Sequence, residues 1–208
     1  MHSGLSPEKR AENEAVDRKN RRRALRERLL AAREALSPEL CERFSAQIRV
    51  HLQHAFPEIA SRRVAFCWPI RNEPDLRPLI AGWLAEGKPG FMALLPVVNG
   101  PAQALAFRAW RPGCPMQEDR FGIPSPTEGT LAEPEVLLIP VNAFDANGYR
   151  LGYGGGFFDR TLAELQPSPM AIGVGYELAR VDSIFPEAHD IRLDAVVTEA
   201  GVCRTDFR

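Results

Sequence analysis

A glycine-rich segment holds the densest group of residues suited to binding an anion. Residues 148–160 read GYRLGYGGGFFDR and lie between the apolar run 136–141 and a helical pattern. Glycines let backbone amides approach a ligand closely, and a helix start presents free N–H groups to an anion. Arg150 adds a forked cation that matches phosphate, and Asp159 is placed to meet a magnesium ion accompanying it. The segment therefore predicts a phosphate site, with a ligand-free turn as the alternative, because it matches neither standard phosphate-loop motif.

The loop after a short β-rich run at 63–68 is a second candidate site. It reads WPIRNE over Trp68–Glu73, and open α/β sheets bind ligands at the ends of their strands. Trp68 offers a face for a flat ring, and Glu73 offers an acceptor for ring N–H groups. The alternative is a core tryptophan beside a solvated carboxylate, and the residue types alone favour that simpler interpretation.

A basic helix start is the third candidate. Arg22 and Arg26 lie four residues apart and so share one helix face. They suit a polyphosphate, although a solvated helix face is the commoner meaning of such a pair. His189 and Asp190, with Asp194 beyond, suit a metal or an acid–base pair, with exposed polar residues as the commoner alternative.

Two further histidines, His51 and His54, are three residues apart on an expected helix. No acidic or thiol partner lies near them in the sequence, so we expect them on the helix surface.

Apolar periodicity and turn residues place these segments in an α/β fold. Residues 1–18 lack apolar periodicity and are predicted to form a flexible polar leader before one domain over 19–208. Helices interleaved with apolar strands predict a single three-layer domain with a largely parallel, Rossmann-like sheet flanked by helices. We expect helices through 22–36, 40–52, 76–84 and 157–165, strands at 63–68, 91–98, 103–110, 136–141, 170–176 and 195–198, and a long loop at 111–134.

The composition is that of an ordinary soluble protein, with 208 residues, 45% hydrophobic and 25% charged. It contains no run of about 18 apolar residues and no signal-peptide centre, so we expect a cytoplasmic protein without a membrane partner.

The four cysteines lie far apart, which suits neither a compact zinc site nor a disulfide framework. Residues 1–36 hold ten Lys and Arg against six Asp and Glu, and residues 37–208 hold 16 against 21. The acidic remainder argues against a nucleic-acid partner.

Together these motifs resemble the 5-formyltetrahydrofolate cyclo-ligase family, over about residues 19–200. The most specific match is FDANGYRLGYGGGFFD at 144–159, which is similar to that family's signature loop. Weaker matches follow in the expected order: RRALR at 22–26 with Arg33 and Leu36-Ser37, NEPD at 72–75, and HDIRLD at 189–194 before a strand that ends in Thr198-Glu199.

The resemblance implies an enzyme that closes the formyl group of 5-formyltetrahydrofolate onto N10, giving 5,10-methenyltetrahydrofolate, ADP and phosphate. It implies ATP and the folate, with or without a polyglutamate tail, as substrates, Mg²⁺ as cofactor, and a protein we expect to be a monomer. Its catalytic residues would be Arg150, Tyr153 and Phe157, with Trp68, Glu73 and Phe157 at the folate and Asp159 and Asp190 at the metal. The nucleotide residues would be Arg22, Arg23, Ala24, Leu25, Arg26, Arg150, Leu151, Gly152, Tyr153, Gly154, Gly155, Gly156, Phe157 and Phe158.

The sequence departs from the family pattern at several positions. Gly155 stands where many members have lysine, which removes one phosphate contact, and Arg22 stands where lysine is also found. Phe157 and Phe158 stand where a pair of tyrosines is frequent, which removes two hydroxyls. These departures leave open a paralogue acting on another substrate, such as a thiamine-related one. A non-catalytic folate-binding protein and a nucleic-acid-binding module that uses the basic first helix are two further alternatives.

Overall fold

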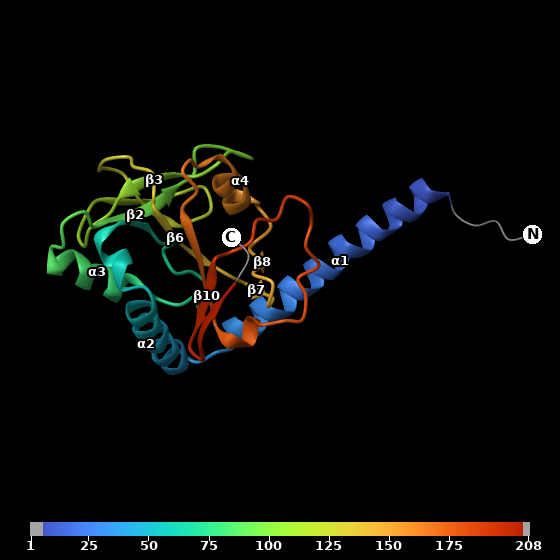
Figure 1. The fold of residues 1–208 in the computed structure, drawn as a ribbon, viewed down its shortest axis with the longest axis horizontal. Coiled ribbons are helices and arrows are strands. Elements are labelled where there is room, and N and C mark those ends of the chain that lie inside the picture. The colour runs from blue at the N-terminus through green and yellow to red at the C-terminus, as the bar shows by residue number, and fades with distance from the viewer. Residues whose placement is uncertain (1–5, 206–208) are drawn as a thin grey trace, which may run out of the picture.

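The computed structural model describes residues 6–205 and is built on a seven-stranded sheet (Figure 1). Its strands are β1 (Arg63–Ala65), β2 (Met92–Val97), β3 (Ala106–Ala109), β6 (Val136–Pro140), β9 (Met170–Val174), β10 (Ala195–Thr198) and β11 (Gly201–Arg204). Their order is β11-β10-β9-β6-β1-β2-β3. The five inner strands pair in parallel, and the edge strands β3 and β11 pair antiparallel. The predicted, largely parallel sheet is therefore confirmed.

Helices cover both faces of the sheet, as the three-layer prediction requires. They are α2 (Pro38–Ala55), α3 (Arg77–Glu86) and α4 (Phe157–Glu164), with 3-10 turns η1 (Pro57–Ser61) and η2 (Glu177–Ala179). Successive strand residues face opposite sides. In β6, Val136 and Leu138 pack with residues of α2 and α3, whereas Leu137 and Ile139 pack with Leu162 of α4. Burial on both faces explains why β6 is a continuous apolar run.

The first helix, α1 (Pro7–Glu34), begins inside the segment for which a flexible leader is predicted. The Ser6 hydroxyl accepts a hydrogen bond from the Lys9 N–H at 3.3 Å, and Pro7 takes the first helical position. Ala, Glu, Lys and Arg dominate the next turns, and these strong helix formers need no buried face. Residues 6–20 are all exposed, and the start of α1 projects from the body (Figure 1). Residues 7–18 are thus helical, and residues 1–5 lie outside the described residues.

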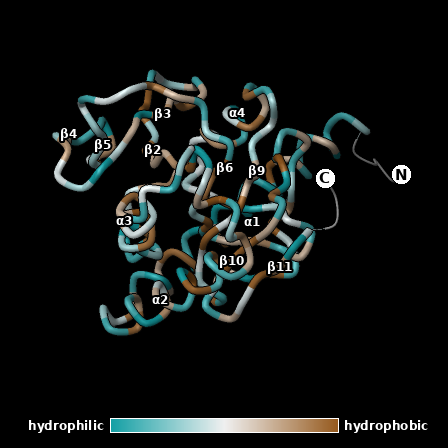
Figure 2. The backbone as a smooth tube through the Cα atoms, turned by 60° about the vertical axis from the view of Figure 1, so that its left-hand side comes forward, coloured by the Kyte–Doolittle hydropathy of each residue, from teal (hydrophilic) through white to brown (hydrophobic). Residues whose placement is uncertain are grey.

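Several short strands form where none is predicted. The expected loop at 111–134 contains an antiparallel ribbon of β4 (Met116–Glu118) and β5 (Pro124–Pro126), which lies at one side of the molecule beside β2 and β3 (Figure 2). A hairpin of β7 (Ala143–Phe144) and β8 (Arg150–Leu151) leads into the glycine-rich segment, and β11 extends the sheet beyond β10. Pairing between distant segments creates these strands, so local patterns do not show them. Across residues 6–205 no helix is both long and apolar enough to span a membrane.

Candidate active site

Two adjoining cavities lie where the loops after β1 and β6 meet the second half of α1. We call the first the arginine cavity; its volume is about 440 Å³ and its wall includes Arg22, Arg23, Arg26, Arg150, the glycines 152 and 154–156, Asp159 and Asp190. We call the second the aromatic cavity; its volume is about 600 Å³ and its wall includes Trp68, Glu73, Phe121, Ile123 and Ser125. Both are lined by Pro140, Tyr153, Gly154, Gly155, Phe157 and Phe158. The glycine-rich segment is therefore a wall that the two cavities share.

The arginine cavity has the charge of an anion site. Its wall contains more basic than acidic side chains: Lys19, Arg22, Arg23, Arg26 and Arg150 against Asp159, Glu187 and Asp190. The helix α4 also begins there, at Gly156, and no side chain caps its first N–H groups. Free N–H groups at a helix start and a surplus of cations both favour a phosphate ligand. The predicted phosphate site thus has the surroundings it needs.

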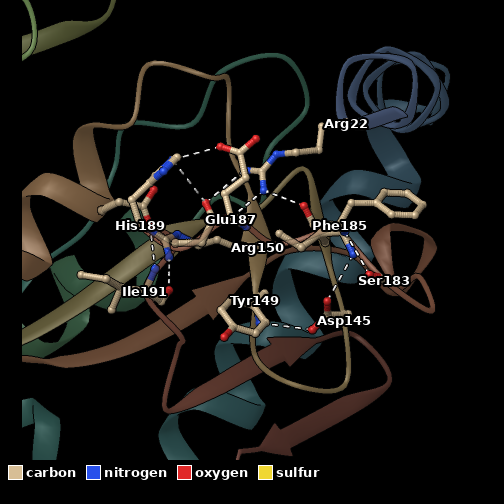
Figure 3. A network of polar contacts seen from close by, with 12 residues as sticks. Arg22, Asp145, Tyr149, Arg150, Ser183, Phe185, Glu187, His189 and Ile191 are labelled. Carbon is tan, nitrogen blue, oxygen red and sulfur yellow. Dashed lines mark hydrogen bonds and ion pairs between the residues drawn. The ribbon is translucent and has the colours of Figure 1, made fainter. Parts of the chain in front are cut away.

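Arg22 is fixed against the segment before β10. Its Nη1 and Nη2 donate to the two carboxylate oxygens of Asp190 at 2.5 and 3.0 Å, and Nη1 also donates to the Phe185 carbonyl at 3.1 Å. Figure 3 shows Arg22 reaching from α1 toward Phe185 and Glu187. Burial acts to raise the pKa of Asp190, but the hydrogen bonds from Arg22 and from the Glu187 N–H outweigh it and hold that pKa below its usual value.

Arg150 is buried beneath the glycine-rich segment. Its Nη1 donates to the Ile191 carbonyl at 2.7 Å, and its Nη2 donates to Asp159 Oδ1 at 3.0 Å (Figure 3 shows the contact with Ile191). The Ile191 N–H donates to the same Asp159 oxygen at 3.0 Å. Arg150 therefore joins the start of α4 to the segment that carries Asp190, in addition to placing positive charge at the cavity wall.

Arg26 lies against the glycines themselves. Its Nε donates to the Gly152 carbonyl at 2.7 Å. A Cβ on Gly154, which has φ +94°, would lie 3.5 Å from the guanidinium carbon of Arg26. Burial and the neighbouring charge of Arg22 lower the pKa of Arg26, although arginine stays protonated at neutral pH. The charges of Arg22 and Arg26 thus repel each other at this wall, and an anion bound beside Arg26 would offset that repulsion.

Asp145 explains why the motif begins with Phe-Asp. Its Oδ1 accepts from the Asn147 and Tyr149 N–H groups, and its Oδ2 accepts from the Ile184 N–H. These bonds close the β7–β8 turn and tie it to the segment beside α1, as Figure 3 shows at Tyr149. Asp145 is buried and shapes the site without lining it.

The carboxylates offer a donor set that fits magnesium. Asp159 and Asp190 both line the arginine cavity, and Mg²⁺ prefers one or two carboxylates together with phosphate and water oxygens. Carboxylate oxygens have several lone pairs, so their bonds to arginine leave acceptor capacity. Among residues 6–205, no cluster of three or more His, Cys, Asp or Glu side chains forms a complete protein cage. The arrangement suits an ion shared with a phosphate ligand.

Three of the predicted nucleotide residues do not line the arginine cavity. Leu25 and Leu151 pack in a small apolar cluster, and Ala24 is exposed on another face of α1. Ala24 follows Arg22 by two positions and so points to another face of α1, whereas packing into the apolar cluster turns Leu25 and Leu151 away from the cavity. Sequence reasoning also missed Lys19, which lines the cavity three residues before Arg22; helical periodicity identifies it. Asn20 and Glu187 are further wall residues that the sequence does not single out.

Glu73 lies in a buried polar network at the inner end of the aromatic cavity. Its Oε1 accepts from the Tyr153 hydroxyl at 2.8 Å, and its Oε2 accepts from the Ile70 N–H at 3.1 Å. Arg33 Nη2 lies 3.8 Å from Oε1 and donates to the Tyr153 hydroxyl at 2.6 Å. Burial raises the pKa of Glu73, and the charge of Arg33 acts in the opposite direction. Glu73 is thus buried, which contradicts the alternative of a solvated carboxylate, and Arg33 is a site residue that the sequence analysis did not assign.

The side walls of the aromatic cavity are rings. Trp68 is half-buried, with the Arg77 guanidinium 4.6 Å from its ring centre, and Phe157 meets Phe121 edge-on with centres 5.9 Å apart. Phe121, on the β4–β5 ribbon, is 52% exposed although it is large and apolar. Such surfaces suit a flat heterocycle, with Glu73 as an acceptor for its polar edge.

The departures at Gly155 and Phe157 are linked in space. A Cβ on Gly155 would lie 2.9 Å from the Phe157 ring. Any side chain at 155 therefore requires that ring to move, so the missing loop lysine and the position of this phenylalanine depend on each other.

Among the remaining candidates, His51, His54 and Asp194 lie outside the cavities, and His189 lines one of them. His51 contacts the Thr198 carbonyl through Nδ1 at 2.9 Å, and His54 is exposed. Asp194 accepts from the Ala171 N–H at 2.7 Å and fixes the entry to β10. His189 lines the mouth of the arginine cavity, with its side chain 68% exposed, 3.5 Å from Glu187.

The fold and the site define an α/β protein with an arginine-lined cavity joined to a cavity lined by aromatic rings. The chain belongs to the 5-formyltetrahydrofolate cyclo-ligase family, whose sequence profile matches residues 18–199. The 5-formyltetrahydrofolate cyclo-ligase of Escherichia coli K12 is 31% identical over 176 residues, which cover 82% of this chain and 96% of that protein. The resemblance inferred from the motifs is therefore confirmed.

Solved structures of similar proteins have the same fold. The NMR structure of Aquifex aeolicus 5,10-methenyltetrahydrofolate synthetase is 32% identical, with a TM-score of 0.77 over 90% of this chain and 94% of that one. The 5,10-methenyltetrahydrofolate synthetase of Mycoplasma pneumoniae is 24% identical, with a TM-score of 0.71 over 86% of this chain and 98% of that one.

Proposed function

We propose that this protein is an ATP-dependent 5-formyltetrahydrofolate cyclo-ligase, with ATP in the arginine cavity and the folate in the aromatic cavity. Family membership supports the reaction. The wall shared by the two cavities supports the placement of both substrates, because phosphoryl transfer requires donor and acceptor atoms to meet.

The chemistry explains the need for both substrates. The formyl oxygen is a poor leaving group until the γ-phosphoryl group moves onto it; a P–O bond forms there and the bond to ADP breaks. N10 then attacks the activated carbon, its proton is lost, the C–O bond breaks and phosphate leaves. Catalysis of such a reaction is mostly positioning and neutralisation of charge.

The arginine cavity would serve the nucleotide. Lys19, Arg22 and Arg26 present cations along one face of α1, opposite the N–H groups at the start of α4. Arg150 joins the start of α4 to the segment at Ile191, and Asp190 of that segment pairs with Arg22 of α1. A magnesium ion held by Asp159 and Asp190 would neutralise phosphate charge when bound.

The aromatic cavity would serve the folate. Glu73 would accept N–H groups from the pterin edge, where a carboxylate accepts in pairs. Trp68 and Phe157 would contact the ring faces, and Tyr153, whose hydroxyl donates to Glu73, stands at the wall shared with the nucleotide. Monomeric state, a cytoplasmic location and use of polyglutamylated folate stay predictions.

The direct test mixes purified protein with 5-formyltetrahydrofolate and Mg²⁺, with and without ATP, and follows near-ultraviolet absorbance of the methenyl product. We expect a rise only when ATP is present, with ADP formed in equal amount. ATP binding without turnover of this folate would instead favour the paralogue acting on another substrate. Folate binding without ATP hydrolysis would favour a non-catalytic folate-binding protein.

A further inference from the structure

Arg33 is a buried basic side chain near the two cavities, and every arm of its guanidinium group is used. It lies in the last turn of α1 and is 5% exposed. Nε donates to the Arg71 carbonyl at 2.9 Å, Nη1 donates to Asn142 Oδ1 at 2.7 Å, and Nη2 donates to the Tyr153 hydroxyl at 2.6 Å. One side chain therefore connects three segments: the turn before Glu73, the loop after β6 and the shared wall.

The turn before Glu73 needs such support. Arg71 and Asn72 have φ of +50° and +58°, a left-handed conformation that costs about 1–3 kcal/mol per residue unless its surroundings hold it. Asn72 Nδ2 is within 3.2–3.4 Å of the carbonyls of residues 33, 34 and 36 at the end of α1. Together with the bond from Arg33 to the Arg71 carbonyl, these contacts fix the direction in which Glu73 leaves the turn.

The charge of Arg33 matters as well. Four groups face Glu73: Arg33 from α1, Arg71 from the turn, Tyr153 from the shared wall and Cys67 from the segment after β1. Arg71 points outward, where it pairs with Glu34 on the surface, with both side chains more than 40% exposed. Cys67 and Tyr153 are neutral at physiological pH, because burial raises both of their pKa values. Arg33 is thus the buried cation that opposes the effect of burial on Glu73.

We propose that Arg33 is a positioning residue for the folate site. It holds the Glu73 and Tyr153 side chains in place and keeps Glu73 ionised, so that Glu73 can accept the pterin N–H groups. The assignment rests on the proposed use of the aromatic cavity by the folate. Arg33 acts through Glu73 and Tyr153, because it lines neither cavity itself. Its loss should therefore affect the folate far more than the nucleotide.

The test compares R33M and R33K with the unmodified protein, by calorimetric binding of 5-formyltetrahydrofolate without ATP between pH 5.5 and 8.5. R33M should weaken folate binding at pH 7 by about 10- to 100-fold, the usual loss for charged hydrogen bonds. Its affinity should also recover as pH rises, because Glu73 without the buried cation has a higher pKa and is protonated at low pH. The lysine of R33K keeps the positive charge but lacks the several N–H donors of a guanidinium group. Its folate affinity should therefore be lower than that of the unmodified protein but should depend on pH in the same way.

A double-mutant cycle guards against simple misfolding. With Y153F present, adding R33K should cost less folate affinity than in the unmodified protein, because Arg33 acts partly through that hydroxyl. R49M is the control: Arg49 is half-buried and, like Arg33, donates to a backbone carbonyl, at Asp75, but it lines neither cavity. R49M should leave the pH profile unchanged.

Several results would overturn the assignment. They are unchanged folate affinity in R33M, identical pH profiles in R33M and R33K, additive effects of R33K and Y153F, or equal losses for ATP and folate. Failure of the unmodified protein to bind 5-formyltetrahydrofolate would instead contradict the proposed function, so the two failures are distinguishable.

Discussion

The substitution R22M should impair the use of ATP far more than the use of the folate. Arg22 neutralises Asp190 with a two-pronged contact at 2.5 and 3.0 Å, and the two side chains are only 13% and 4% exposed. Methionine keeps the length and apolar stem of arginine but removes both donors and the charge. Asp190 would keep the hydrogen bond from the Glu187 N–H but lose its cation.

The magnitude follows from that geometry. Removing one partner of a buried ion pair costs about 3–5 kcal/mol, and the remaining Glu187 bond and the partial exposure reduce this to about 2–3 kcal/mol of unfolding free energy. For a chain of this size that is a fall in Tm of roughly 4–10 °C. If Arg22 also contacts phosphate, the KM for ATP should rise about 10- to 100-fold.

The pH dependence of stability gives a further check. The pKa of Asp190 is depressed in the folded state, so its contribution is complete above the unfolded value of about 4 and is lost as pH falls through the folded pKa. The unfolding free energies of R22M and the unmodified protein should therefore differ at neutral pH and converge in acid.

The assay measures initial rates against ATP and against 5-formyltetrahydrofolate separately, with thermal unfolding followed in parallel. R28M is the control, since Arg28 is exposed on α1 and lines neither cavity. The reasoning is refuted if R22M keeps the KM for ATP of the unmodified protein, or if both KM values rise equally.

Three other substitutions test the shared wall and the metal site. G155A should raise the KM for folate and lower Tm, because its Cβ would lie 2.9 Å from the Phe157 ring. In kinetic measurements the rise in KM caused by G155A should be smaller when F157A is also present. F121A should raise the KM for folate about 2- to 12-fold with little change in Tm or in the KM for ATP, since the ring is 52% exposed; unchanged folate kinetics would remove Phe121 from the site. D159N should raise the Mg²⁺ concentration for half-maximal rate about 10- to 100-fold, and an unchanged magnesium titration would exclude a metal contact at Asp159.

The walls of the two cavities keep their charged and aromatic side chains despite the departures from the family pattern. The arginine cavity keeps four arginines and Lys19 on its wall although Gly155 contributes no charge. Phe157 fills the space beside Gly155 and forms an aromatic contact with Phe121. The glycine at 155 and the phenylalanine ring at 157 therefore depend on each other sterically.

Local patterns in the sequence determined the larger elements and the main motif. The continuous apolar run became β6, Ser37 and Pro38 began α2, and Gly156 preceded α4, because burial on both faces, capping and helix periodicity all depend on residues close in the chain. The same local rules applied to residues 7–18, where helix propensity without an apolar stripe still gave a helix.

Only the tertiary structure decided how the motifs combine. It brought Arg33, Glu73 and Tyr153 together from positions 40 and 80 residues apart, and it turned Leu25 and Leu151 away from the cavity that their neighbours line. It also placed Phe121 of a ribbon, which the sequence shows as a loop, against Phe157. These contacts join segments that are far apart in the sequence, and they form only when the sheet and its connections are complete. Residue spacing along the chain therefore does not predict them.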